Sequence, residues 1–142
     1  EKVRNYKPDI IVLLQPTSPL RSNKDIDNAI KLFIKSNATS LVSTVNLPHN
    51  FNPESIMTLK NNKLYGLKKS LKNHVTIRQQ KEKYLARNGA AIYISSYDSI
   101  LKNKSFYGEK TIPYFMSKIN SIDIDDQEDL IIAESIIKNQ NF

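Results

Sequence analysis

The chain has 142 residues, 39% of them hydrophobic, which suits a single globular domain. It contains no cysteine, which excludes disulfides and thiolate zinc sites, and no apolar run approaches the ~20 residues of a membrane span. The first residues include no initiator Met and nothing typical of a signal peptide. We therefore expect a cytoplasmic protein without membrane contact, and a sequence that is a piece of a longer protein.

The formal net charge is +7, and the basic residues are concentrated in one segment. Residues 60–87 carry nine basic side chains and one acidic one, whereas residues 88–142 carry five basic and eight acidic ones. Most individual lysines are expected on the solvated surface, but their concentration favours an anionic ligand or partner. One alternative is therefore a non-catalytic module that binds nucleic acid or another anionic partner, although regularly interleaved aromatic residues are missing.

The amino-terminal third predicts two strands and a helix. The apolar run at residues 9–14, bounded by two prolines, is typical of a parallel strand buried on both faces. Ser22 is placed to cap the following helix. The apolar positions of that helix are Ile26, Ala29, Ile30, Phe33 and Ile34. Residues 40–45 predict the next strand, so the three elements form a βαβ unit.

Residues 46–87 interrupt this rhythm, and we interpret them as an inserted arm with a turn that leads into a short strand. The elements expected after the arm are a strand at residues 89–95, a short helix near 97–102, an alternating strand at 121–125 and an amphipathic helix at 127–138. Strands that alternate with helices imply an α/β sandwich.

The sequence LLQPTSPLR, residues 13–21, lies where the first strand must leave the sheet, because Pro16 and Pro19 cannot continue a hydrogen-bonded ladder. Ligands of open α/β sheets bind beyond the carboxyl ends of strands. The candidate substrate-binding side chains of this turn are Gln15, Thr17, Ser18 and Arg21, which offer an amide, two hydroxyls and a cation. Taken alone, a proline turn before a capped helix is the simpler interpretation.

The sequence SIDID suggests a metal site. On the expected strand Asp123 and Asp125 share one face, where two carboxylates repel each other unless a cation neutralises them. A few oxygen ligands, with room for water and phosphate, are what Mg²⁺ takes. The alternative is that Asp125 or Asp126 only caps the following helix.

Two further groups of residues could line a ligand site. Arg78 and Arg87 could each pair with a carboxylate or phosphate through two parallel hydrogen bonds, and Asn88-Gly89 is typical of a tight turn before a strand. The aromatic residues Phe106, Tyr107 and Tyr114 could wall a pocket, although core packing is the commoner role for such residues.

Together, LLQPTSPLR, RQQ followed by RNGAAIYI, and SFYGEK followed by YFMSKINSIDIDDQEDL occur in the order and near the spacing of one family. Over nearly its whole length the chain resembles the cytidylyltransferases that make CMP-activated acidic sugars, such as CMP-N-acetylneuraminate synthetases and their legionaminate and pseudaminate relatives. The resemblance implies a Rossmann-like nucleotide-diphospho-sugar transferase sandwich. It also implies a Mg²⁺-dependent reaction in which the sugar's anomeric hydroxyl attacks the α-phosphorus of CTP and releases pyrophosphate.

The resemblance implies roles for individual residues. Asp123 and Asp125 correspond to the metal-binding pair, and Arg78 corresponds to an arginine that helps to bind the acidic sugar or the phosphates. The residues that correspond to the sugar pocket are Gln15, Asn88, Tyr93, Phe106 and Tyr107.

The glycine-rich, basic loop that binds CTP in this family has no counterpart here, because Gly66, Gly89 and Gly108 form no cluster. We therefore expect residues 1–142 to be the carboxy-terminal portion of a single cytidylyltransferase domain, inactive alone. A degenerate or regulatory fragment is a further alternative. The resemblance also implies a homodimer in which residues 46–87 form a dimerisation arm over the neighbouring active site, the alternative being a solvated loop.

Overall fold

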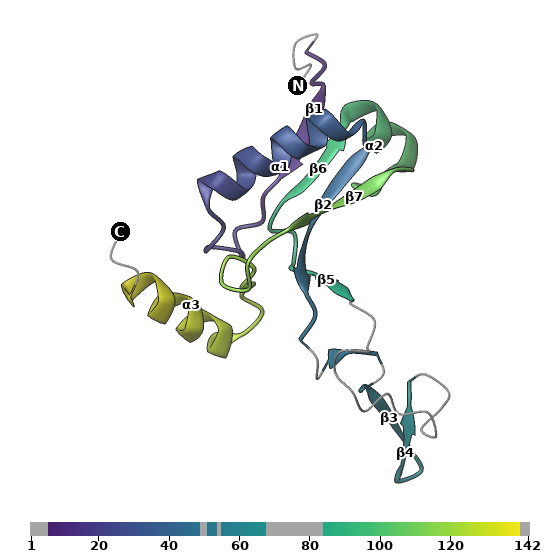
Figure 1. Ribbon diagram of the computed structural model, residues 1–142, viewed down its shortest axis with the longest axis vertical. Coiled ribbons are helices and arrows are strands. Elements are labelled where there is room, and N and C mark those ends of the chain that lie inside the picture. The colour runs from purple at the N-terminus through teal and green to yellow at the C-terminus, as the bar shows by residue number, and fades with distance from the viewer. Residues whose placement is uncertain (1–5, 49–50, 54, 68–83, 140–142) are drawn as a thin grey trace, which may run out of the picture. The chain divides into compact units, whose positions relative to one another are not determined.

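The computed structural model describes residues 6–48, 51–53, 55–67 and 84–139 (Figure 1). The chain divides into two compact units. The first unit comprises Glu1–Val45 and Arg87–Phe142, and the second comprises Asn46–Ala86. In the part of the chain that the structure describes, no helix has the length and apolarity needed to cross a bilayer.

The first unit is built on a mixed β-sheet, which confirms the predicted α/β class. The strands, in spatial order, are β1 (Ile10–Leu13), β6 (Tyr93–Ser96) and β2 (Ser40–Asn46), and β7 (Thr111–Phe115) also pairs with β2. The short strand β5 (Leu85–Arg87) spans the boundary between the two units in the sequence. β6 is antiparallel to both β1 and β2, and β7 is parallel to β2.

The expected βαβ unit is therefore only partly correct. β1 and β2 run in the same direction, but β6 lies between them, so they are not neighbours. The prediction that the first strand is parallel to its neighbour and buried on both faces is wrong, because β1 pairs with antiparallel β6 at one end of the strand order and its residues are only half-buried.

Helix α1 (Asn23–Ser36) begins at the predicted cap. The Ser22 side chain accepts a hydrogen bond from the Asp25 backbone N–H, and the Asp25 carboxylate accepts one from the Ser22 N–H in return, so two otherwise unpaired amides are satisfied. Ala29 and Phe33 are buried as expected, whereas Ile34 is 65% exposed and does not belong to the apolar face.

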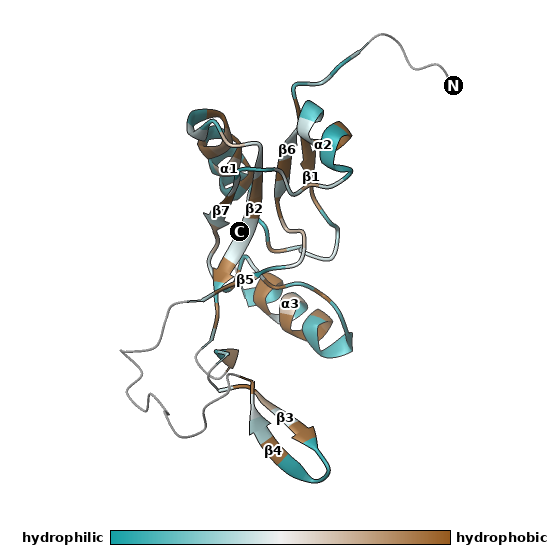
Figure 2. Cartoon of the chain, turned by 90° about the vertical axis from the view of Figure 1, so that its right-hand side faces the viewer, coloured by the Kyte–Doolittle hydropathy of each residue, from teal (hydrophilic) through white to brown (hydrophobic). Residues whose placement is uncertain are grey.

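The core lies on both faces of the sheet. On one face Ala29 and Phe33 of α1 pack with Leu41, Ile92 and Ile94. On the other face a smaller cluster of Val42, Ala90 and Tyr93 packs with Leu13 and Phe106. Figure 2 shows the hydrophobic residues of β1 and β6 in brown. Because adjacent residues of β6 point to opposite faces, Tyr93 and Ile94 belong to different clusters.

Helices α2 (Tyr97–Asn103) and α3 (Gln127–Asn139) confirm the two later helix predictions. The strand expected at residues 121–125 is wrong: the backbone N–H of Ile124 donates to the Thr17 carbonyl, and the segment joins no strand ladder within the described residues. The strand β7 was not predicted, because Pro113 lies at its centre. A proline argues against a strand in the sequence, since it lacks the N–H that a ladder hydrogen bond needs and is confined to positions where none is required.

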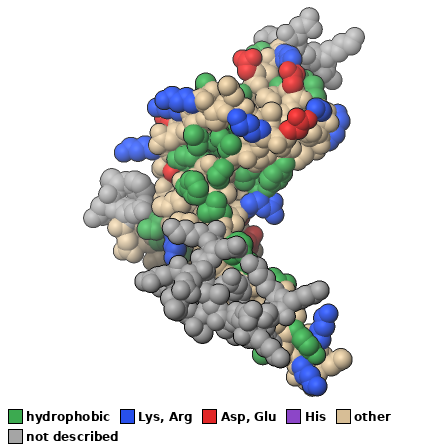
Figure 3. Space-filling view, turned by 45° about the vertical axis from the view of Figure 1, so that its right-hand side comes forward, with side chains coloured by type: hydrophobic (Ala, Val, Ile, Leu, Met, Phe, Trp, Pro, Cys, Tyr) green, Lys and Arg blue, Asp and Glu red, His purple; other side chains and the backbone are tan. Residues whose placement is uncertain are grey.

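The second unit contains the antiparallel hairpin of β3 (Met57–Lys60) and β4 (Lys63–Gly66). Its turn residues Asn61 and Asn62 have φ of 49° and 57°, the left-handed conformation that a two-residue hairpin turn requires. The predicted turn and the short strand after it, β4, are thus confirmed, whereas β3 was not predicted. In Figure 3 hydrophobic and basic side chains lie together on the described part of this hairpin.

Candidate active site

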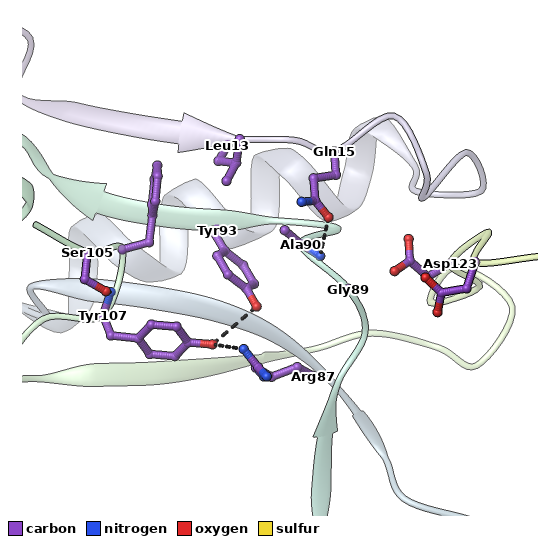
Figure 4. A pocket seen from close by; sticks show the side chains of 11 residues that line it. Leu13, Gln15, Arg87, Gly89, Ala90, Tyr93, Ser105, Tyr107 and Asp123 are labelled. Atoms are coloured by element: carbon purple, nitrogen blue, oxygen red, sulfur yellow. Dashed lines mark hydrogen bonds between the residues drawn. The ribbon is translucent and has the colours of Figure 1, made fainter.

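A pocket of about 730 Å³ opens in the first unit where β1 ends and β6 begins. Its lining residues are Leu13, Gln15, Arg87, Gly89, Ala90, Tyr93, Ser105, Phe106, Tyr107, Asp123 and Asp125. Figure 4 shows Tyr93 and Tyr107 on one side, Asp123 on the other and Gln15 above the space between them. The pocket lies beyond the carboxyl end of β1, where the sequence predicted a ligand site.

Asp123 and Asp125 both line the acidic end of the pocket, although they lie in a loop and not on the predicted strand. Asp123 is half-buried and its Oδ1 accepts a hydrogen bond of 3.0 Å from the Ser18 hydroxyl, while Asp125 is exposed. Within the described residues no Lys or Arg forms an ion pair with either carboxylate. The two carboxylates are therefore the groups of this pocket that could hold a cation.

Of the two aspartates named as possible caps of the following helix, Asp126 is the one that caps it. One Asp126 oxygen accepts hydrogen bonds of 2.9 Å from the backbone N–H groups of Glu128 and Asp129 at the start of α3. The Asp125 carboxylate does not cap the helix and instead faces the pocket. Capping and a role in the pocket are thus divided between neighbouring aspartates.

The predicted turn at Asn88-Gly89 is confirmed, and it shapes the acidic end. Gly89 has φ of +63°, and a Cβ atom at this position would lie 2.1 Å from the Asp123 Oδ2. Any larger residue here would collide with the carboxylate as well as strain the backbone. The glycine therefore permits the close approach of Asp123.

The opposite end of the pocket combines aromatic rings with a cation. The Arg87 guanidinium donates a hydrogen bond of 3.0 Å to the Tyr107 hydroxyl, which lies 3.3 Å from the Tyr93 hydroxyl. Burial raises the pKa of Tyr93, and the hydrogen bond with Tyr107 raises it further. The Tyr93 hydroxyl therefore stays protonated near neutral pH. The bond to Tyr107 raises the pKa of Arg87. Phe106 packs beside Tyr93, with ring centroids 6.4 Å apart.

Gln15 lines the pocket between the two ends. Its side-chain Oε1 accepts a hydrogen bond of 3.1 Å from the Ala90 backbone N–H, and its backbone N–H donates to the Ala90 carbonyl. Because the oxygen is engaged, the side-chain NH₂ group is left to face a ligand. Gln15 can thus donate hydrogen bonds to a ligand's oxygen atoms.

Four predicted substrate-binding residues do not line the pocket. The Thr17 carbonyl accepts from Ile124, the buried Ser18 bonds to Asp123, and Arg21 Nη1 donates to the carbonyl oxygens of Gln15 and Ala91, at 3.1 and 2.8 Å. Burial lowers the pKa of Arg21. The buried Asn88 bonds to the side chains of Ser43, Ser121 and Met116.

The sequence prediction missed several lining residues, and one predicted site residue, Arg78, has no described position. Arg87 was noted only as one possible cation and Gly89 only as part of a turn, and the lining residues not identified at all are Leu13, Ala90 and Ser105. The place of Leu13 and Arg87 at the ends of two strands could have identified them. Arg78, together with most of the basic segment that motivated the nucleic-acid alternative, lies outside the described residues.

No family model matches the chain. It is 31% identical to the post-translational flagellin modification protein B of Campylobacter coli and 32% identical to the CMP-N,N'-diacetyllegionaminic acid synthase of Legionella pneumophila. These matches cover 94% and 92% of this chain and 54% of each relative. An N-acylneuraminate cytidylyltransferase of Escherichia coli is 31% identical over 91% of the chain and 30% of its own length.

The chain thus spans about half the length, or less, of the curated relatives it matches. The resemblance inferred from the motifs is confirmed: over most of its length the chain is homologous to N-acylneuraminate cytidylyltransferases and CMP-N,N'-diacetyllegionaminic acid synthases.

Proposed function

We propose that the protein carrying this sequence transfers CMP from CTP to an acidic nonulosonic sugar such as N-acetylneuraminate and releases pyrophosphate. One observation carries the proposal: a single pocket has two carboxylates at one end and an arginine with two tyrosines at the other. The homology to enzymes named for such sugars supports the same reaction.

Asp123 and Asp125 fit a Mg²⁺ ion by their chemistry. Mg²⁺ prefers oxygen ligands and is usually held by one or two carboxylates, with water and substrate phosphate completing its shell. Among the described residues no group of three or more Asp, Glu, His or Cys side chains is placed to hold a metal ion together, so water and substrate phosphate would have to supply the remaining ligands. A bound Mg²⁺ would stabilise the charge that develops on the α-phosphate and on the leaving pyrophosphate.

The other end of the pocket suits the sugar. Arg87 is exposed and positively charged, and it can pair with a carboxylate. The hydroxyls of Tyr93 and Tyr107 are hydrogen-bonding groups of the pocket, and Gln15 presents its amide NH₂ group. This end therefore offers hydrogen-bond donors to an oxygen-rich anion, and the pocket would hold the anomeric hydroxyl between the sugar contacts and the acidic end.

The direct test supplies the protein with CTP, Mg²⁺ and either N-acetylneuraminate or N,N'-diacetyllegionaminate. We expect equal amounts of pyrophosphate and CMP-sugar, measured by a coupled phosphate assay and by mass spectrometry. The isolated 142 residues should form neither product. Release of pyrophosphate without a nonulosonic acid, or a preference for another sugar class, would contradict the proposal.

The acidic end is tested by Asp123→Asn and Asp125→Asn. Each change removes one negative charge and keeps the side-chain size, so turnover should fall by about 10²-fold or more while the circular dichroism spectrum is unchanged. Asp27→Asn, an exposed aspartate of α1, is the matched control and should retain full activity. Near-normal rates in both pocket variants would remove the metal from the proposal.

We also propose that the protein is a homodimer in which residues 46–87 form an arm and Arg78 serves the partner's site. The resemblance to the family supports this, as do the exposed apolar side chains of the hairpin, such as Leu59 and Leu64. Mixing inactive Arg78→Ala and Asp125→Asn proteins should then restore part of the activity, because one site of each mixed dimer is intact. No recovery, or a monomer by light scattering, would contradict the arrangement.

A further inference from the structure

Ser18 occupies an unusual position for a serine in a proline turn. It is only 1% exposed, although Thr17 and Pro19 on either side of it are exposed. Its hydroxyl donates to the Asp123 Oδ1 at 3.0 Å, across 105 residues of sequence. Ser18 does not line the pocket, so it is poorly placed to contact a substrate.

The segment that carries Asp123 has no strand neighbours to hold it within the described residues. It is held instead by individual hydrogen bonds. The Ile124 N–H donates to the Thr17 carbonyl at 2.8 Å, and the buried Asn88 amide donates to the Ser121 hydroxyl at 2.9 Å. These bonds fix the backbone on both sides of Asp123 but leave its carboxylate to be oriented by its own contacts.

Two contacts define that orientation. Ser18 engages Oδ1, and Gly89 allows Oδ2 to approach its Cα closely, where a Cβ would lie 2.1 Å away. The Asp123 carboxylate thus lies between the buried Ser18 hydroxyl and the Gly89 backbone, and it still lines the pocket. Without the hydroxyl, Oδ1 would lose its hydrogen bond and the carboxylate could rotate.

We propose that Ser18 is a positioning residue that holds Asp123 in the orientation needed to bind a divalent cation. This inference rests on the proposed function of the acidic end, and it assigns to Ser18 a role different from the substrate contact that the sequence predicted. Groups that hydrogen-bond to a metal-binding carboxylate typically change metal affinity by 10- to 100-fold when they are removed. We expect an effect of this size from Ser18.

The test measures the binding of Mn²⁺ alone to the protein, without CTP or sugar, from the loss of the electron paramagnetic resonance signal of free Mn²⁺. Ser18→Ala should weaken binding by about tenfold or more. Ser18→Cys keeps a side chain of similar size with a weak donor, and should lie between Ala and the unchanged protein. Asp123→Asn supplies the reference for complete loss of the ligand.

Ser95→Ala is the matched control. Ser95 is also fully buried and its hydroxyl also bonds across the structure, to the Thr39 carbonyl at 3.1 Å, but it does not line the pocket. Its removal should lower the thermal unfolding temperature about as much as Ser18→Ala while leaving Mn²⁺ binding unchanged. A purely structural Ser18 would behave in the same way as Ser95, and that result would overturn the inference.

The outcomes for the inference and for the proposed function can be told apart. Loss of Mn²⁺ affinity in Ser18→Ala and Asp123→Asn supports the inference even when the protein forms no CMP-sugar. Loss in Asp123→Asn alone overturns the inference and leaves the reaction intact. Unchanged binding in both variants overturns the inference, and the CMP-sugar assay then decides separately on the reaction.

Discussion

The two units of the chain reach their conformations by different means. In the first unit Leu41, Ile92 and Ile94 are fully buried, in one cluster with Ala29 and Phe33 of α1. In the described part of the second unit no apolar side chain is buried, and Leu59 and Leu64 are 68% and 60% exposed. Burial of apolar surface therefore stabilises the first unit, whereas local hydrogen bonds and turn geometry define the hairpin of the second.

The turns of the two units show the same difference. The turn at Gly89 is also constrained by its surroundings, because Asp123 leaves no space for a side chain. The turn at Asn61 and Asn62 is fixed by the chain itself, because asparagine tolerates the left-handed conformation more readily than most residues. Both turns thus follow from local residue types, but at Gly89 a long-range contact with Asp123 also excludes any side chain.

The largest expected effect contrasts one leucine from each unit. Leu41→Ala removes a fully buried side chain and should lower the free energy of unfolding by about 3 kcal/mol. Leu59→Ala removes an exposed one and should change it by less than about 0.5 kcal/mol. Denaturation followed by circular dichroism at 222 nm reports the first unit, which contains all the described helices. Equal effects would show that Leu59 is covered in solution.

Gly89→Ala should follow in size. A left-handed alanine costs about 1–2 kcal/mol, and its Cβ would also displace Asp123, so both stability and Mn²⁺ binding should fall. Asn37→Ala is the control, because Asn37 ends α1 with φ of 50° away from the pocket and should lose stability only. Normal Mn²⁺ binding by the Gly89 variant would contradict the close contact with Asp123.

A smaller effect should appear at acid pH in the first unit. Burial tends to raise the pKa of Asp25, but hydrogen bonds from Ser22, Asn120 and Tyr114 together outweigh it and lower the pKa. A lowered folded pKa adds stability above the unfolded value of about 3.9, and this stability is lost as pH falls through the folded pKa.

Asp25→Asn should remove this part of the pH dependence, which can be measured as the difference in unfolding free energy between pH 6 and pH 3. Asp27→Asn on the exposed side of the same helix should leave it unchanged. Equal pH profiles for the Asp25 variant and the unchanged protein would show that the carboxylate gains nothing from the three residues that donate to it.

The smallest effect concerns the hairpin. Asn62→Gly creates the Asn-Gly pair that two-residue turns prefer, and should stabilise the hairpin by a few tenths of a kcal/mol. Amide hydrogen exchange should slow at the β3–β4 pairs, such as Thr58 with Tyr65, and stay unchanged in β6. Slower exchange in β6 as well would mean that the two units are coupled.

Much of the local structure could be predicted from the sequence. The capping box of α1, the turn at Asn88-Gly89 and the hairpin turn depend on residues close together in the chain, and each was identified. The pocket residues Gln15, Tyr93, Phe106, Tyr107 and the two aspartates were identified through motifs. The arrangement of strands was not, because a pattern of apolar residues does not show that β6 inserts between β1 and β2.

By itself, the sequence determined the three described helices, the strands β1, β2, β4 and β6, the caps, the chemistry gathered at the pocket and the homology. Only the tertiary structure decided which polar residues face the pocket and which support it. Ser18 and Asn88 have the same hydrogen-bonding groups whether they contact a ligand or a neighbouring loop, and their burial against Asp123 and Ser121 selects the second. The physical reason is that burial and orientation depend on residues more than 30 positions away, which no local pattern records.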